Sequence, residues 1–186
     1  TKGKKLSSYN KSEDTIPHIN KIKMLGLTVD CTLSFEKHID IIVRKQAQRL
    51  HVLRVMSRAN YNHKDLINIY YAYINSIATY ASVAFVNIGN TQNYKLQQIH
   101  DRAHKLICGE ICYNKDCKLQ ETIKQQRQKS AIKFLEKIEK NQESKINNLL
   151  PLKLSTTGKY AEVKRRTTWK CNSFFVFTPS LSNKVS

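Results

Sequence analysis

The stretch that decides the fold runs from residue 23 to residue 39 and reads KMLGLTVDCTLSFEKHI. Its first half alternates, and the side chains on the apolar side are Leu25, Leu27 and Val29. This is the period of a strand with one buried face, and a glycine within it, Gly26, marks a close backbone approach or a bulge. We expect Asp30-Cys31-Thr32 to turn the chain before Ser34 caps a helix.

Four helices are predicted downstream, because apolar residues recur there at helical spacing. They run from about Phe35 to Ala59, His63 to Val86, Gln92 to Cys108 and Leu119 to Asn141. Asn62 is expected to cap the second helix, and Gly109 to end the third. The residues expected to point from the second helix into the core are Leu66, Tyr70, Tyr73, Ile77, Tyr80 and Ala84. Core packing with bonded hydroxyls is the favoured role of these tyrosines, ahead of stacking on nucleic-acid bases.

The predicted fold class is therefore mainly α, with a short N-terminal β-hairpin, a bundle of about four helices and an irregular basic C-terminal tail. The expected organisation is a polar lead over 1–20, a hairpin over 21–35, a helical bundle over 36–146 and a C-terminal extension over 147–186. In the extension, Phe174-Phe175-Val176-Phe177 predicts an extended apolar strip that packs back on the bundle.

The charge of the chain is strongly one-sided, with 32 Lys and Arg against 14 Asp and Glu and a formal net charge of +18. Such an excess favours a polyanionic partner, nucleic acid first and an anionic membrane surface second. On the first predicted helix, the basic residues project to one face, away from the apolar residues. They are Lys37, Arg44, His51, Arg54 and Arg58. Asp40 is the only acid on that side, so we expect phosphate contact there, with a merely solvated face as the alternative.

The five cysteines are an odd number without a dense framework, which predicts reduced thiols and an intracellular location, in the cytoplasm or the nucleus. Residues 66–94 lack charge, but asparagine and serine interrupt them, so a buried bundle helix is expected and membrane insertion is not. A series at four-residue steps, His100, His104, Cys108 and Cys112, offers weak zinc ligands. Four-residue steps drift around a helix, so buried cysteines and surface histidines are the favoured interpretation and zinc is not expected.

Residues 23–39 fit the pattern K-x-L-G-h-x-h-D-x-x-L-S-F-x-x-H-I, where h is apolar. This pattern resembles the segment that follows the catalytic palm in reverse transcriptases of non-LTR (LINE-type) retrotransposons, where a primer-grip hairpin leads into a helical thumb. Looser similarities follow in the same order at Leu66–Ala81, Leu96–Gly109 and Ser173–Asn183. In the last of these, Ser182 stands where a Trp is usual.

The resemblance implies a fragment of a transposable-element RNA-directed DNA polymerase: primer grip, thumb and C-terminal extension without the palm. No two aspartates are adjacent in the chain, so no catalytic residue is expected and the chain is not predicted to be an enzyme by itself. Mg²⁺ is expected only in the missing palm, which a longer chain would supply.

The implied partner is RNA or an RNA–DNA duplex, held by the template–primer backbone. The implied nucleic-acid-binding residues are Lys23 and Gly26 near the primer end, and Lys37, Arg44, Arg54, Arg58, Lys164, Arg165 and Arg166 on phosphates. Three alternatives stay open: a non-catalytic helical protein-interaction module whose apolar second helix docks a partner, a zinc-stabilised module, and a degenerate transposon remnant without activity.

Overall fold

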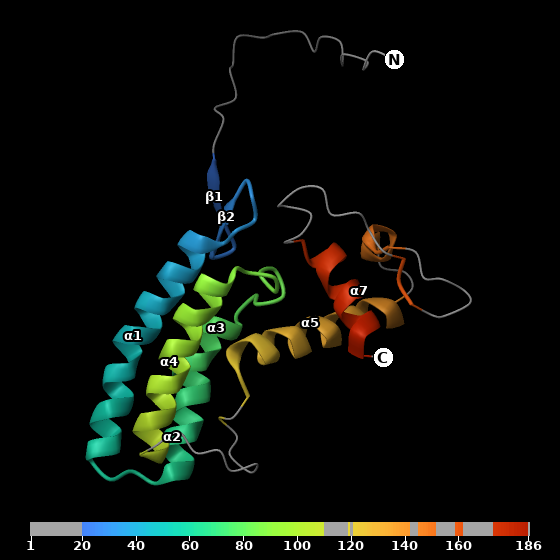
Figure 1. Cartoon of the computed structure of the whole chain (residues 1–186). Coiled ribbons are helices and arrows are strands. Elements are labelled where there is room, and N and C mark those ends of the chain that lie inside the picture. Colours follow the sequence, from blue (N-terminus) through green and yellow to red (C-terminus); the bar gives the residue numbers. More distant parts are fainter. Residues whose placement is uncertain are drawn as a thin grey trace, which may run out of the picture.

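Three helical columns stand side by side in the computed structural model, with a β-hairpin at one end and a crossing pair of helices beside them (Figure 1). The structure describes residues 20–109, 119, 121–141, 145–151, 159–161 and 173–185. Its elements are β1 (Lys21–Met24), β2 (Leu27–Asp30), α1 (Glu36–Arg58), α2 (His63–Ile69), the π-helix η1 (Tyr70–Asn75), α3 (Ser76–Thr79), α4 (Asn90–Cys108), α5 (Ile123–Lys140), the 3₁₀ helix η2 (Lys145–Leu149) and α7 (Phe174–Val185). The predicted mainly α fold with an N-terminal hairpin is confirmed.

The hairpin reverses earlier than the alternation predicted. Strands β1 and β2 pair antiparallel, with Met24 opposite Leu27, so the hairpin turn consists of Leu25 and Gly26. The predicted turn at Asp30-Cys31-Thr32 is also present, since the N–H of Leu33 donates to the carbonyl oxygen of Asp30 at 3.0 Å, but it leads from β2 into α1. Both turn residues have positive φ, 47° and 84°, as a two-residue turn of this hand requires. The prediction of one continuous strand over residues 24–30 was wrong because alternation persists on both sides of so short a turn. Gly26 thus provides the positive φ that the turn requires, and it does not mark a bulge.

The start of α1 depends on Asp30. Its carboxylate accepts hydrogen bonds from the backbone N–H groups of Ser34 (3.1 Å) and Phe35 (2.9 Å), and from the hydroxyl of Thr32. Phe35, with φ 54°, holds the N-cap position predicted for Ser34, whose Oγ accepts a long 3.4 Å bond from the N–H of Glu36. Asp30 is thus the turn former that the sequence indicated.

Helix α1 has close to the predicted bounds. The apolar side chains that it buries are Ile39, Ile42, Leu50 and Leu53. It packs against α4 and η1, and it also buries two polar side chains, His38 and Gln46, that the apolar pattern did not indicate.

The second column is three short helices end to end, and not the single helix predicted to reach Val86. Asn62 caps α2 as expected, since its side chain accepts from the N–H of Lys64 at 3.3 Å. The column stops at Thr79, because Tyr80 has ψ 122° and Ala81 has φ 49°.

The π-helix η1 changes which residues of this column are buried. A π-helix bonds residue i to i+5, so its buried row advances by more than the usual 3.6 residues per turn. The buried row is Leu66, Tyr70, Ile74 and Ala78. Tyr73 and Tyr80, predicted to be in the core, are 43% and 57% exposed, and Ile77 and Ala84 are half-buried.

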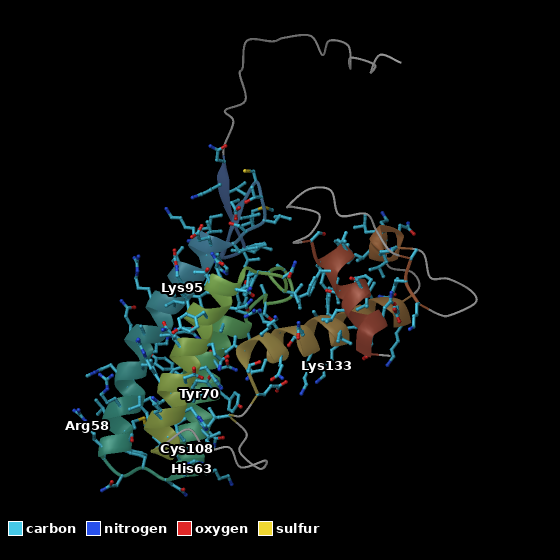
Figure 2. All side chains as sticks on the ribbon, in the orientation of Figure 1. Arg58, His63, Tyr70, Lys95, Cys108 and Lys133 are labelled. Atoms are coloured by element: carbon cyan, nitrogen blue, oxygen red, sulfur yellow. The ribbon has the colours of Figure 1, made fainter. Side chains whose placement is uncertain are left out.

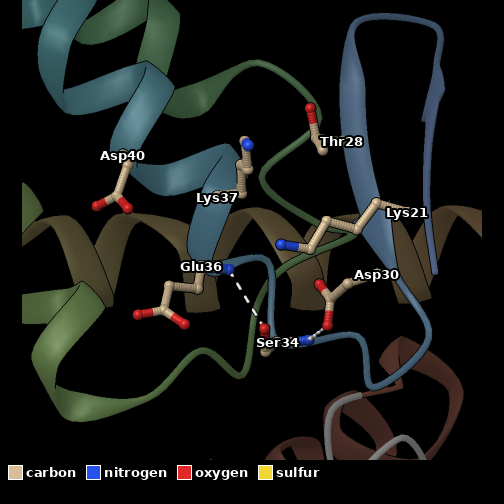
Figure 3. A pocket seen from close by; sticks show the side chains of 7 residues that line it. All are labelled: Lys21, Thr28, Asp30, Ser34, Glu36, Lys37 and Asp40. Atoms are coloured by element: carbon tan, nitrogen blue, oxygen red, sulfur yellow. Dashed lines mark hydrogen bonds between the residues drawn. The ribbon is translucent and has the colours of Figure 1, made fainter.

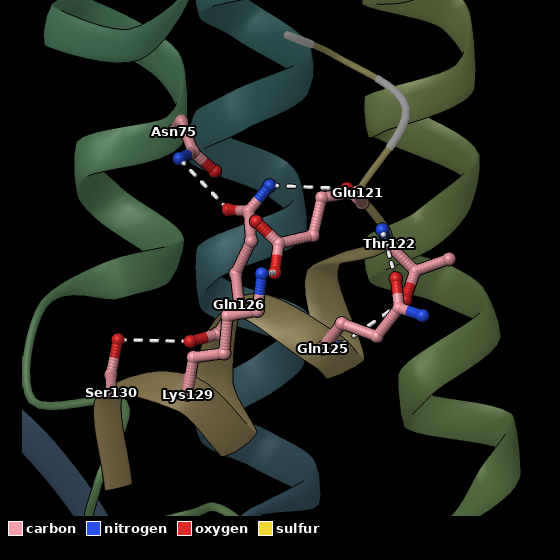
Figure 4. Close-up of polar contacts among 7 residues, drawn as sticks. All are labelled: Asn75, Glu121, Thr122, Gln125, Gln126, Lys129 and Ser130. Atoms are coloured by element: carbon pink, nitrogen blue, oxygen red, sulfur yellow. Dashed lines mark hydrogen bonds and ion pairs between the residues drawn. The ribbon is translucent and has the colours of Figure 1, made fainter. Parts of the chain in front are cut away.

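Helix α5 begins at Ile123, four residues later than predicted, behind a capping box. The hydroxyl of Thr122 accepts from the N–H of Gln125, and the side chain of Gln125 accepts from the N–H of Thr122 (Figure 4). The side chain of Asn75 donates to Gln126 at 3.2 Å and so ties η1 to the first turn of α5.

The segment from Phe174 to Phe177 is the first turn of helix α7, so the predicted extended strip was wrong. A short apolar run fits a strand or a buried helix equally well by period alone. Phe174 packs against Phe134 of α5 with ring centroids 5.5 Å apart, and Thr178, one helical turn later, is also buried. The strip does pack on the bundle, as a helix. Within the described ranges, no helix has the length and apolar character needed to cross a membrane.

Candidate nucleic-acid interface

One face of α1 carries the predicted basic residues, and all of them are exposed. They are Lys37, Arg44, His51, Arg54 and Arg58, which we call the basic face. From Lys37 to Arg58 the helix rises about 31 Å. Arg58 extends away from the bundle at the lower end of α1 (Figure 2). Within the part of the chain that the structure describes, none of the arginines and lysines of this face forms a salt bridge.

Two acids, Glu36 and Asp40, lie on this side of the first turns of α1, and Asp40 is paired. Lys95 of α4 donates to the carboxylate of Asp40 at 2.6 Å, and both side chains are partly exposed (Figure 2). An exposed pair of this kind contributes little to stability. Its electrostatic consequence is larger: Asp40 is neutralised from α4, so it does not offset the basic face.

Arg49, on another side of α1, has a packing role. Its Nη1 donates to the carbonyl oxygen of Tyr73 at 2.6 Å, and its guanidinium lies 4.3 Å from the centre of the Tyr73 ring. These contacts join α1 to η1 and hold the exposed Tyr73 ring under a cation. Arg49 is therefore not counted with the basic face.

The hairpin adds lysines at the upper end of α1. Lys21 and Lys23 lie on the polar side of β1, opposite Asp30 and Thr28 in the register, and both are exposed. A groove of about 300 Å³ separates the hairpin from the first turns of α1, and Figure 3 shows Lys21 and Lys37 extending into it. Lys21 was not among the predicted binding residues, because only the tertiary position of the hairpin brings it beside Lys37.

The same groove carries carboxylates, which limit its affinity for anions. Burial raises the pKa of Asp30, but hydrogen bonds from Thr32, Ser34 and Phe35 outweigh burial and lower it to about 2. Asp30 is therefore ionised at neutral pH, and Glu36 and Asp40 also line the groove. We expect the phosphate contacts on the exposed outer part of α1, not deep in this groove.

Gly26, the predicted contact near a primer end, lies at the tip of the hairpin, at the opposite end of α1 from Arg58 (Figure 1). A Cβ atom at Gly26 would lie 3.6 Å from Cε1 of Tyr80, in ordinary van der Waals contact. The predicted basic run Lys164, Arg165 and Arg166 lies outside the described residues.

Two of the weak zinc candidates, His100 and His104, lie in the buried interior of the bundle. His100 and His104 are both buried, contrary to the prediction of surface histidines, and their rings stack with centroids 6.5 Å apart. Nε2 of His100 lies 2.8 Å from the carbonyl oxygen of Leu119, and Nδ1 lies 2.5 Å from the hydroxyl of Tyr70. Because a carbonyl only accepts, Nε2 carries the proton and Nδ1 accepts from Tyr70.

Both ring nitrogens of His100 are thus engaged, which leaves none for a metal. Over the described residues there is no group of three or more His, Cys, Asp or Glu side chains that could hold a metal ion. Cys108 is half-buried, and Cys112 and Cys117 fall outside the described residues. Burial lowers the pKa of both His100 and His104, more than nearby Asp101 raises them, so their neutral forms are favoured.

Comparison of the chain with protein-family models, with curated proteins and with solved structures gives no match. The resemblance of residues 23–39 to the post-palm segment of non-LTR reverse transcriptases therefore stays a prediction. The geometry itself establishes an exposed basic face, about 31 Å long by helical rise, whose arginines and lysines form no salt bridge with any residue that the structure describes.

Proposed function

We propose that this chain binds the sugar–phosphate backbone of RNA or an RNA–DNA duplex through the basic face of α1, in the way that a reverse-transcriptase thumb holds its template–primer. The observation that carries the proposal is the exposed row from Lys37 to Arg58, whose arginines and lysines form no salt bridge with the described residues, beside an Asp40 that Lys95 neutralises. Residues 44–58 contain no acidic residue, whereas a helix face that is solvated and rich in salt bridges alternates in the sign of its charges.

The length of the basic face suits an extended backbone ligand. Its rise of about 31 Å along α1 allows contact with several phosphates of a duplex. Arg and Lys contacts to phosphate position a duplex without reading its sequence, and they release counterions. Binding by this face is therefore sequence-independent and falls steeply with salt.

In the proposed complex the hairpin lies at the primer end, with Lys23 and Gly26 nearest to it. No residue of this chain has a catalytic role there. Polymerisation by two metal ions needs carboxylates held a few ångströms apart. In this proposal a palm in a longer chain supplies those carboxylates and Mg²⁺.

The rival role as a protein-interaction module relied on an apolar second helix that docks a partner. The apolar row of that column, Leu66, Tyr70, Ile74 and Ala78, faces α1 and α4 inside the bundle. No observation therefore favours this docking surface over the basic face. A transposon remnant without activity would not bind nucleic acid, so a binding measurement distinguishes it from the proposed function.

The test is a salt titration of binding to an RNA–DNA hybrid, measured by fluorescence anisotropy. The variant Arg44→Ala/Arg54→Ala/Arg58→Ala is compared with Lys124→Ala/Lys133→Ala/Lys137→Ala, which removes three exposed cations from α5. If the three arginines contact phosphates, the slope of log affinity against log salt becomes shallower by about two to three in the first variant. The second variant keeps the native slope. Absence of binding, or equal slopes in both variants, overturns the proposal.

A further inference from the structure

A second cavity, of about 280 Å³, lies where the hairpin turn meets α1 and α3. The residues that line it are Gly26, His38, Ile41, Ile42, Lys45, Ser76, Ile77 and Tyr80. Apolar walls with a few polar groups are typical of a small-ligand or base pocket. None of the predicted binding residues except Gly26 belongs to it.

Tyr80 gives this cavity a fixed aromatic surface. Its hydroxyl donates to the carbonyl oxygen of Leu25 at 2.8 Å, and its ring packs against Gly26. The side chain is nevertheless 57% exposed. An aromatic ring held at two points and open to solvent can stack on a base without losing much conformational entropy on binding.

His38 gives the cavity wall a buried donor. The side chain is 5% exposed, and its Nδ1 accepts from the backbone N–H of Thr28 at 3.4 Å. The proton of the neutral ring is therefore on Nε2, which has no hydrogen-bond partner in the described part of the chain. Burial and the nearby Lys45 lower the pKa of His38, so the neutral ring is the favoured form. That nitrogen is itself shielded from solvent, so His38 forms part of the cavity wall and does not offer its Nε2–H to a ligand in the cavity.

Lys45 connects the cavity to the basic face. Lys37, Ile41 and Lys45 follow one another at four-residue steps, so they lie on adjoining turns of one side of α1. Lys37 belongs to the basic face, whereas Ile41 and Lys45 line the cavity. The ammonium group of the exposed Lys45 is therefore available to a phosphate next to the cavity.

We propose that this cavity receives one unpaired base of the nucleic acid held on the basic face: the base stacks on Tyr80 beside the apolar side chains of Ile41 and Ile77, and Lys45 contacts the adjacent phosphate. The inference rests on the proposed function. It goes beyond that function because backbone contacts alone give no preference for an unpaired nucleotide.

The experiment compares a blunt RNA–DNA hybrid with the same hybrid carrying one unpaired 2-aminopurine nucleotide at its end. Stacking of one base on an aromatic ring corresponds to about ten- to hundredfold in affinity. We expect the overhang hybrid to bind at least tenfold more tightly, with quenched 2-aminopurine fluorescence. Tyr80→Leu removes this preference, and Tyr80→Phe, which keeps the ring, preserves it. Tyr94→Leu, which changes an exposed tyrosine of α4, also preserves it.

The outcomes separate the two proposals. Salt-dependent binding without an overhang preference, or a preference that survives Tyr80→Leu, overturns the base pocket and leaves the basic face intact. If neither hybrid binds, the proposed function falls, and the pocket is tested with 2-aminopurine riboside 5′-monophosphate alone. Quenching that Tyr80→Leu abolishes then supports a nucleotide site, and absence of quenching overturns it.

Discussion

The hydroxyl of Tyr70 lies 2.5 Å from Nδ1 of His100 in the interior of the bundle. Tyr70 comes from η1 and is 1% exposed, and His100 comes from α4 and is also buried. The other ring nitrogen of His100 donates to the carbonyl oxygen of Leu119, just before α5. One imidazole thereby connects η1, α4 and the approach to α5. Burial raises the pKa of Tyr70 well above its ordinary value, so its phenol stays a donor.

Tyr70→Phe is expected to destabilise the chain by about 1–2 kcal/mol, because it leaves Nδ1 of His100 buried without a donor. In a chain of this size that corresponds to a fall of roughly 2–8 °C in Tm. Thermal unfolding followed by circular dichroism measures it. Tyr94→Phe, which removes an exposed hydroxyl on α4, is the control and should change Tm by less than about 1 °C. Equal Tm values for the two variants would show that the Tyr70–His100 bond contributes nothing.

Acid should destabilise the fold below about pH 6.5, the ordinary pKa of an unfolded histidine. Burial lowers the pKa of His38, His100 and His104 in the folded chain, so the unfolded chain binds more protons in this range. The contribution of these neutral histidines to the free energy of unfolding is therefore fully present above pH 6.5. It is lost as the pH falls from there through the pKa values of the folded chain. Each histidine contributes up to about 1.4 kcal/mol per pH unit.

Urea unfolding at intervals between pH 7.5 and 5 measures this dependence. His104→Leu removes one of the three groups, so the slope of unfolding free energy against pH should fall by up to about a third. Gln48→Ala changes an exposed side chain of α1 that carries no ionisable group, and it is the control that should leave the slope as it is. A wild-type chain whose stability does not change over this range would contradict the prediction.

The helical part of the fold was predictable because burial repeats with a helix's own period. The buried apolar residues of α1 and the stop at Gly109 follow from local patterns alone. Two local features could not be predicted from the period of the apolar residues. A two-residue turn keeps the strand alternation on both sides, so the period could not show that the chain reverses at Gly26. The π-helix η1 shifts the buried row, so Tyr73 is exposed, and the column ends at Thr79, so the exposed Tyr80 lies beyond it.

The candidate site also has one part that local sequence patterns predict and another part that depends on the tertiary structure. The basic face was predictable because helical projection places Arg44, Arg54 and Arg58 opposite the apolar residues. The pairing of Asp40 with Lys95, and the cavity that joins His38 to Tyr80, depend on which helices are neighbours. A histidine one position before the buried Ile39, on the core side of the helix, is the one signal that could have indicated a buried ring.

Asp30→Ala should destabilise the hairpin–helix junction by about 1–2 kcal/mol, since the N–H groups of Ser34 and Phe35 lose their acceptor. The pKa of Asp30 is lowered to about 2 in the fold, despite the opposing effect of burial. Its stabilising effect is therefore present above about pH 4 and is lost as pH falls toward 2. Urea unfolding at pH 7 and at pH 2.5 tests this: the difference between wild type and variant should shrink at the lower pH. Asp65→Ala, in the first turn of α2, is the control and should cost less than about 1 kcal/mol.

Arg127 of α5 is a buried cation without a counter-ion in the described residues. Its side chain is 1% exposed, and its Nη2 donates to Oδ1 of Asn93. Its Nε and Nη1 atoms have no hydrogen-bond partner in that part of the chain. Burial lowers its pKa to about 10, so the guanidinium is still charged at pH 7. Desolvation of an ion costs several kcal/mol unless its partners offset that cost. Among the described residues, the partner of this guanidinium is the side-chain amide of Asn93.

Arg127→Met should therefore stabilise the chain, by about 1–2 kcal/mol, because a thioether of similar length fills the space without a desolvated charge. The gain is limited, since Oδ1 of Asn93 loses its donor at a cost of about 1 kcal/mol. Urea unfolding at pH 7 measures the change. Lys133→Met, on the exposed side of the same helix (Figure 2), removes one positive charge at the surface and controls for net charge. If Arg127→Met is less stable than Lys133→Met, the guanidinium has partners that offset its desolvation.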